Sequence, residues 1–181
     1  MQTRLKNAAD NTPTERMTLR WVYVYVALIP LVNWSFAHVP TVAMPDGGAW
    51  SPMAIVTGLV LVFRDFAQRE VHHYIILPLM IGIGISYFMA PPAIALASGM
   101  AFAASELIDY VIFTVSKRPF SSRVMLSTML SAPVDSALFL IIADIAVPGV
   151  FSTLTLITSV ASKLFGAYVV YLLIKRRERE A

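Results

Sequence analysis

Six long apolar segments, separated by short polar connections, run through the sequence from residue 21 onward. They cover residues 21–39, 51–66, 74–89, 93–115, 124–147 and 151–174. A helix needs about 20 largely apolar residues to cross the hydrocarbon of a bilayer, so most of these lengths are typical of membrane-spanning helices. The second segment is short for a span unless it continues through Arg69. The pattern therefore predicts an all-α integral membrane protein with six transmembrane helices in one bundle.

The basic residues are distributed unevenly among the connections. Lys and Arg occur before residue 21, around residues 64–73, within residues 116–123 and after residue 174, whereas the connections at 40–50, 90–92 and 148–149 contain none. Of the 14 Lys and Arg residues, Lys163 alone falls in the middle of an apolar segment. Because Lys and Arg are enriched on the cytoplasmic side of a membrane, we expect cytoplasmic tails at residues 1–20 and 175–181. The transmembrane domain between them, residues 21–174, is expected to lie in the cell inner membrane.

Composition agrees with a membrane protein and excludes several function classes. Hydrophobic residues make up 57% of the chain and charged residues only 14%, against about 25% charged residues in a typical soluble domain. The absence of cysteine excludes disulfides and thiolate chemistry, and a net charge of +3 is too small to indicate nucleic-acid binding. We find no set of nucleophile, base and metal ligands at one depth, so we expect neither an enzyme nor a metal or cofactor site.

Four ionisable residues are predicted to lie at membrane depth. Glu106 and Asp109 are three residues apart and therefore project from one face of the fourth helix. Asp135 and Lys163 fall about halfway along the fifth and sixth helices. A carboxylate at the centre of a membrane helix costs about 2.5–3.5 kcal/mol on insertion scales, so these side chains must face the protein interior. We expect Lys163 to pair with Asp135 or Glu106, leaving other carboxylates for a proton, a cation or a ligand.

Hydroxyl and aromatic residues share the helix faces that carry these charges. Ser131 and Phe139 flank Asp135 at helical spacing, and Phe102 and Tyr110 do the same around Glu106. A face that combines carboxylate, hydroxyl and aromatic groups suits a flat heteroaromatic molecule, whose rings stack and whose edge groups form hydrogen bonds. Asn33, a polar residue in the first helix, is a further candidate, with packing as the equally favoured alternative.

A charged segment ends the second apolar run. Asp65 and Gln68 share a helix face there and are candidates to line an inner gate, together with Arg64. Arg69 is better interpreted as an anchor whose long side chain reaches the membrane interface.

Several short motifs together resemble those of the VUT family of vitamin uptake transporters. They are the sequence SELIDY at residues 105–110, the basic pair at 117–118, VDSALF at 134–139 and SKL at 162–164. The segment at residues 64–70 is similar to the family's acidic motif at the inner end of the second helix, with Asp65 or Glu70 as the matching acid. The similarity covers most of the chain from the second segment onward and implies a membrane bundle of six helices.

The resemblance implies uptake of a queuosine precursor, 7-cyano-7-deazaguanine (preQ0), with its 7-aminomethyl relative as a second candidate. A deazaguanine presents two adjacent donors, N1–H and an exocyclic amine, which fit one carboxylate, and an O6 acceptor that suits a lysine. Glu106 or Asp135 is then expected at the donor edge, with Asp109 as a supporting or gating acid and Lys163 at a carboxylate or the acceptor.

A different function remains open at this point. The chain is small enough to be a substrate-capture subunit for a vitamin-like molecule, which would need a separate energising module. In both cases the expected partners are a small molecule and the lipid bilayer. Faces of small residues permit a homodimer without requiring one.

Overall fold

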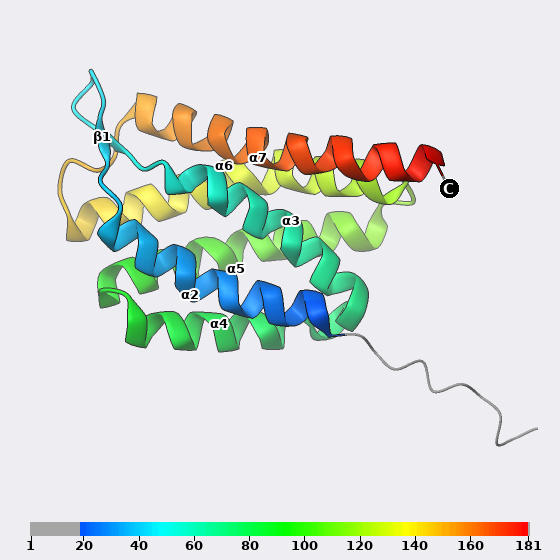
Figure 1. The fold of residues 1–181 in the computed structure, drawn as a ribbon. Helices are drawn as coiled ribbons and strands as arrows, with labels where there is room; N and C mark the ends of the chain where they lie inside the picture. The colour runs from blue at the N-terminus through cyan, green and yellow to red at the C-terminus, as the bar shows by residue number, and fades with distance from the viewer. Residues whose placement is uncertain (1–18, 181) are drawn as a thin grey trace, which may run out of the picture.

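The computed structural model describes residues 19–180 and consists almost entirely of helices (Figure 1). The elements are α2 (Arg20–His38), β1 (Val42–Ala43), β2 (Ala49–Trp50), α3 (Met53–Val71), the 3-10 helix η1 (His72–Ile75), α4 (Ile76–Met89), α5 (Pro92–Val115), α6 (Phe120–Ala146) and α7 (Thr153–Glu180). The two short strands pair antiparallel and form a small ribbon between α2 and α3.

Five helical stretches within residues 19–180 are long and apolar enough to cross a membrane. One of them, Met53–Met89, is 37 residues long and contains α3, η1 and α4. His72 interrupts this stretch with a φ of 50° and a ψ of −116°, and the chain reverses there so that α4 runs back along the bundle (Figure 1). The predicted class, a helical integral membrane protein, agrees with these helices.

The large exposed side chains are also those of a membrane protein. Phe88, Ile145 and Tyr74 are more than three-quarters exposed, and many other Leu, Ile, Val and Met side chains are about half exposed. A soluble monomer rarely exposes so much contiguous apolar surface. The buried positions hold a high share of Ser, Thr and charged residues instead. The bundle is therefore apolar outside and partly polar inside, as expected for a protein surrounded by lipid.

Helix ends differ from the predicted ends where polar residues face the interior. The second apolar run ends at residue 66 by its composition, with a continuation through Arg69 left open; α3 continues to Val71, and Arg64, Asp65 and Gln68 are buried within it. The last helix continues to Glu180 rather than ending at residue 174. There the Glu178 carboxylate accepts hydrogen bonds from the backbone N–H and the hydroxyl of Ser121 at the start of α6. Most of the predicted N-terminal tail, residues 1–18, lies outside the described residues.

The helices pack as an antiparallel bundle. α2 contacts both α3 and α4, α5 lies along α6, and α7 packs against α3 and α6. The start of α2, the turns that follow α3 and α5, and the end of α7 lie at one end of the bundle (Figure 1). The ribbon and the turns that follow α4 and α6 lie at the other, which we call the ribbon end.

Arg64 does not belong to the basic connection in which the sequence pattern placed it. Its side chain is 1% exposed and faces the interior from α3, so the basic residue at this end of the bundle is Arg69, in the last turn of α3. The Arg69 guanidinium lies 4.4 Å from the ring centroid of Phe120. Glu70, also near the end of α3, accepts hydrogen bonds from the backbone N–H groups of Trp21 and Val22 and so caps the start of α2.

Two glycines allow α3 and α7 to approach closely. A Cβ atom on Gly58 would lie 2.4 Å from the carbonyl oxygen of Lys163, and one on Gly166 would lie 2.8 Å from the carbonyl oxygen of Ile55. Neither position has room for a side chain, and small residues are the usual means of bringing membrane helices together. The crossing places Lys163 in the middle of the bundle.

Candidate functional site

A cavity of about 350 Å³ lies at the ribbon end of the bundle. Its walls come from α2, β2, the start of α3, α5, α6, the turn that follows α6, and α7. A smaller space of about 20 Å³ lies deeper between α2, α3, α5, α6 and α7. Phe36, Phe139 and Lys163 line both spaces, so the smaller one continues the cavity toward the bundle centre. We call the two together the ribbon-end cavity.

An ion pair forms the floor of the ribbon-end cavity. The Lys163 ammonium donates a hydrogen bond to a carboxylate oxygen of Asp135, and the two residues are 4% and 3% exposed. This partner is one of the two that the sequence left open for Lys163. A paired lysine and aspartate keep the floor neutral, which removes most of the cost of placing charge inside a membrane.

Unpaired polar groups surround the ion pair. Among the described residues, the Asn33 amide nitrogen and the Ser136 hydroxyl are buried without a hydrogen-bond partner. Asn33 lines the deeper space and Ser136 the larger one. Because buried polar groups are nearly always hydrogen-bonded, these two are available to a polar ligand in the cavity.

Aromatic rings form part of the cavity wall. Phe36 of α2 and Phe139 of α6 lie with their ring centroids 5.1 Å apart and their planes at 42°. Phe102 of α5 lines the deeper space and is largely buried. The cavity therefore combines two charged groups of opposite sign, unpaired amide and hydroxyl groups, and apolar ring faces. This is the usual composition of a site for a small organic molecule.

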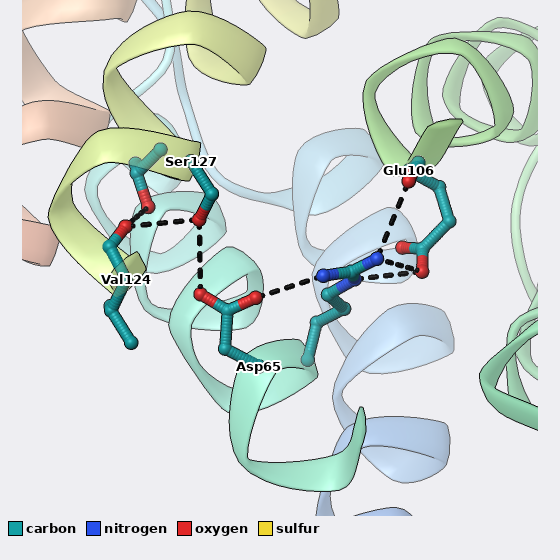
Figure 2. A network of polar contacts seen from close by, with 6 residues as sticks. Asp65, Glu106, Val124 and Ser127 are labelled. Atoms are coloured by element: carbon teal, nitrogen blue, oxygen red, sulfur yellow. Dashed lines mark hydrogen bonds and ion pairs between the residues drawn. The ribbon is translucent and has the colours of Figure 1, made fainter. Parts of the chain in front are cut away.

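A second polar group lies outside the cavity, around Arg64 (Figure 2). The guanidinium binds the Glu106 carboxylate at 2.6 and 2.7 Å and the Asp65 carboxylate at 2.9 Å. It also donates to the backbone carbonyl of Glu106 at 3.3 Å. The Ser127 hydroxyl, from α6, lies 3.2 Å from the second oxygen of Asp65. This group joins α3, α5 and α6 in the interior.

The structure thus separates residues that the sequence placed around one ligand. Those beside the ribbon-end cavity are Asn33, Phe102, Asp135, Phe139 and Lys163. Those away from its lining are Arg64, Asp65, Gln68, Glu106, Asp109 and Ser131. Tyr110 is also away from the cavity lining, and its hydroxyl lies 2.6 Å from Nδ1 of the exposed His73.

Other cavity residues were not singled out from the sequence, although helical spacing points to them. Phe36 follows Asn33 by three residues and Ser159 precedes Lys163 by four, so each shares a face with a residue that was identified. Ser136 is next to Asp135 in the chain. Extending each polar helix face by one turn would have identified Phe36 and Ser159 from the sequence.

The ribbon lies beside the cavity and is attached to the start of α7. The Asp46 carboxylate accepts hydrogen bonds of 2.8 Å from the backbone N–H of Leu154 and from the Ser152 hydroxyl. These bonds, the one from Leu154 most of all, hold the pKa of Asp46 below its ordinary value. Asp46 therefore joins the β1–β2 turn to the helix that carries Lys163.

Comparison with known proteins identifies the family. Residues 51–175 match the model of the Vut_1 family, described as "Putative vitamin uptake transporter". This chain belongs to the Vut_1 family. No curated protein matches it. No solved structure matches it either.

Family membership agrees with the resemblance found in the sequence motifs. Together with its apolar helices, it makes the chain a multi-pass membrane protein of a transporter family. A transporter of this family takes a small molecule as its substrate. Within residues 19–180, no three His, Cys, Asp or Glu side chains are grouped so as to hold a metal ion. The matched region includes Asp135 and Lys163 as well as the residues around Arg64.

Proposed function

We propose that this Vut_1 protein carries a queuosine precursor, 7-cyano-7-deazaguanine, across the cell inner membrane into the cytoplasm. The observation that carries the proposal is the Asp135–Lys163 pair at the floor of a cavity walled by Phe36 and Phe139. A volume of about 350 Å³ lies within the range of sites for small organic molecules. The family's transport role supplies the reaction class.

The two charged groups match adjacent groups on one edge of a deazaguanine. N1–H and the exocyclic amine are adjacent donors for the Asp135 carboxylate, while O6 accepts from the Lys163 ammonium. The bicyclic ring then lies against the faces of Phe139 and Phe36. Glu106, the other residue expected at the donor edge, is held by Arg64 and does not line the cavity. Asp135 is therefore our candidate for this role.

We further propose six membrane spans with both termini in the cytoplasm. α4 alone is about 21 Å long, and η1 adds about 8 Å, which brings this segment to roughly the thickness of the hydrocarbon. The end opposite the ribbon carries Arg20, Arg69, Lys117, Arg118 and the basic residues at the end of α7. The positive-inside rule favours placing that end in the cytoplasm, so the ribbon-end cavity opens to the outside.

The proposal is tested with purified protein in two steps. Thermal-shift binding in detergent compares 7-cyano-7-deazaguanine with its 7-aminomethyl relative, guanine and a panel of vitamins. Uptake of the best ligand is then measured in liposomes that contain this chain alone. We expect 7-cyano-7-deazaguanine to bind and to enter, and Asp135→Asn and Lys163→Met to remove both activities. Tyr110→Phe is the matched control and should retain them.

Two results would count against this assignment. Binding of a vitamin in preference to every deazaguanine would overturn the substrate. Binding without uptake by the chain alone would favour a capture subunit that depends on a separate energising module.

A further inference from the structure

Three carboxylates lie around one cation in the interior of the bundle, and two of them are paired with it. Asp65, Glu106 and Asp109 are all largely or fully buried, and the guanidinium of Arg64 is the cation. We call these four residues the Arg64 cluster. Arg64 and the other two carboxylates are near enough to Asp109 to act on it electrostatically. The cluster would carry a net charge of −2 if every member were ionised.

Asp109 is the member without a cation. Within residues 19–180, the ion pairs of Arg64 are formed with Asp65 and Glu106, and none is formed with Asp109. Asp109 is 1% exposed, and no described residue forms a hydrogen bond with its Oδ1 atom. The Ser131 hydroxyl acts on the Asp109 carboxyl as a hydrogen-bond donor, although no bond of ordinary geometry joins it to Oδ1. A buried carboxylate with one bare oxygen and no ion pair is poorly suited to the ionised form.

Within residues 19–180, Arg64 is the cation that acts most strongly on Asp109. The other charged and titratable side chains with the largest effects around the cluster are Asp65 of α3, Glu106 of α5 and Tyr25 of α2. α6 contributes the hydroxyls of Ser127 and Ser131 and, nearer its start, the guanidinium of Arg123, and η1 contributes His73, which lies against Tyr110. The facing part of α4, residues 76–83, has no titratable side chain. Two carboxylates that share a low-dielectric site cannot both ionise freely, so one of them takes up a proton.

The Arg64 cluster lies at a different depth from the cavity. Glu106 is nine residues and Asp109 six residues from the end of α5, whereas Asp135 is 15 residues from the start of α6 at the same end of the bundle. At 1.5 Å per residue, the cluster is about 9–13 Å nearer the end without the ribbon. No member of the cluster lines the ribbon-end cavity. It is therefore a candidate site of its own.

We propose that the Asp109 carboxyl is a proton-binding site that couples substrate uptake to proton entry. With its proton, Asp109 is neutral and Arg64 keeps Glu106, which joins α3 to α5. When the proton leaves for cytoplasmic water, the Asp109 carboxylate competes with Glu106 for the guanidinium. The proton can leave only once the bundle has opened toward the cytoplasm, so this competition weakens the ion pair between the two helices afterwards. It thereby favours return of the empty carrier to its outward-facing state, where a proton from outside restores the neutral carboxyl. One proton enters with each neutral substrate, so each cycle moves one positive charge inward.

This coupling rests on the proposed uptake function, but protonation of Asp109 is measured without any substrate. Infrared difference spectra of the purified protein, recorded across a pH titration and in H₂O and D₂O, report the C=O stretch of a buried protonated carboxyl. We expect such a band in the unmodified protein and its loss in Asp109→Asn. Glu180→Gln, at the exposed end of α7, is the matched control and should keep the band. An Asp109→Asn spectrum identical to that of the unmodified protein would overturn the site.

Transport is then measured in liposomes with an imposed gradient of protons or of sodium. An outside-acid gradient should drive accumulation of 7-cyano-7-deazaguanine, roughly tenfold for each pH unit. Asp109→Asn should still bind the substrate but lose this accumulation, while Glu180→Gln keeps it. Accumulation driven by sodium and not by protons, or by protons equally well in Asp109→Asn, would refute the coupling. If no deazaguanine binds the unmodified protein, the proposed substrate fails, and the infrared result still decides the proton site.

Discussion

Adding one methyl group at the crossing of α3 and α7 should disturb the cavity floor from a position that touches no ligand. The Cβ atom of a Gly58→Ala variant would lie 2.4 Å from the carbonyl oxygen and 2.6 Å from the Cα atom of Lys163. Ordinary contact begins at 3.4 Å, so the α7 backbone must move by about 1 Å, and overpacking of this kind costs about 1–3 kcal/mol. Lys163 moves with the α7 backbone, so the hydrogen bond from its ammonium to the Asp135 carboxylate is broken or distorted.

The matched control for this variant is Gly84→Ala in α4. A Cβ atom there has nothing within 4 Å. Both substitutions gain the same helix propensity, about 1 kcal/mol, so the difference between the two variants isolates the crossing. Thermal unfolding in detergent should give Gly58→Ala a free energy of unfolding about 1–3 kcal/mol lower than that of Gly84→Ala.

Substrate binding gives the second readout of the crossing. A hydrogen bond to a charged group contributes about 1.5–3 kcal/mol, so misplacing the Lys163 ammonium should weaken binding at least roughly tenfold. Gly84→Ala should bind as the unmodified protein does. Equal stability and equal affinity in the two variants would show that the α3–α7 crossing does not position the cavity floor, and the reasoning would fail.

Three further predictions follow from the polar interior. Lys163→Met and Asp135→Asn should each destabilise the protein by about 3–5 kcal/mol by leaving one buried charge unpaired, and the double variant should recover most of this loss in chemical unfolding. Arg64→Met should lower the thermal unfolding temperature of the detergent-solubilised protein, because two buried carboxylates lose their cation. The pKa of Asp46 is lowered in the folded state, so its contribution to stability is present above the ordinary value of 3.8 and is lost as the pH falls through the lower folded value. Asp46→Asn should remove this part of the acid dependence of unfolding.

Hydropathy located the helices well because lipid exposure selects for long apolar runs. It left the end of α3 open between residue 66 and Arg69, because Arg64, Asp65 and Gln68 interrupt the apolar run where the edge of the membrane was expected. A polar side chain ends an apolar run in the sequence, but it does not end a helix when it faces other helices. For the same reason Arg64 was assigned to the connection after the second helix, although it lies buried in α3.

The ion-pair partner of each buried charge was harder to predict than its depth in the membrane. Depth follows from counting residues along a helix, and Asp135 and Lys163 were placed at matching depths on that basis. The partner of a charge depends instead on which helices are neighbours and how each is rotated about its axis. The sequence offered Glu106 as a candidate partner for Lys163. In the structure Glu106 pairs with Arg64, which the sequence pattern had placed in a connection, and Lys163 pairs with Asp135. A single sequence carries little information on this rotation.

The neutral floor of the cavity also bears on selectivity. A molecule that enters between Asp135 and Lys163 must replace the hydrogen bond that the Lys163 ammonium donates to the Asp135 carboxylate, since a buried charged group left unpaired costs more than about 1–3 kcal/mol. A ligand with donors on one edge and an acceptor beside them satisfies both groups at once, as a deazaguanine does. A ligand that offers acceptors alone satisfies Lys163 and leaves the carboxylate bare. The Asp135–Lys163 pair thus discriminates between ligands by the order of donors and acceptors along the ligand edge. The surrounding aromatic rings bind any flat molecule, so they contribute affinity with little discrimination.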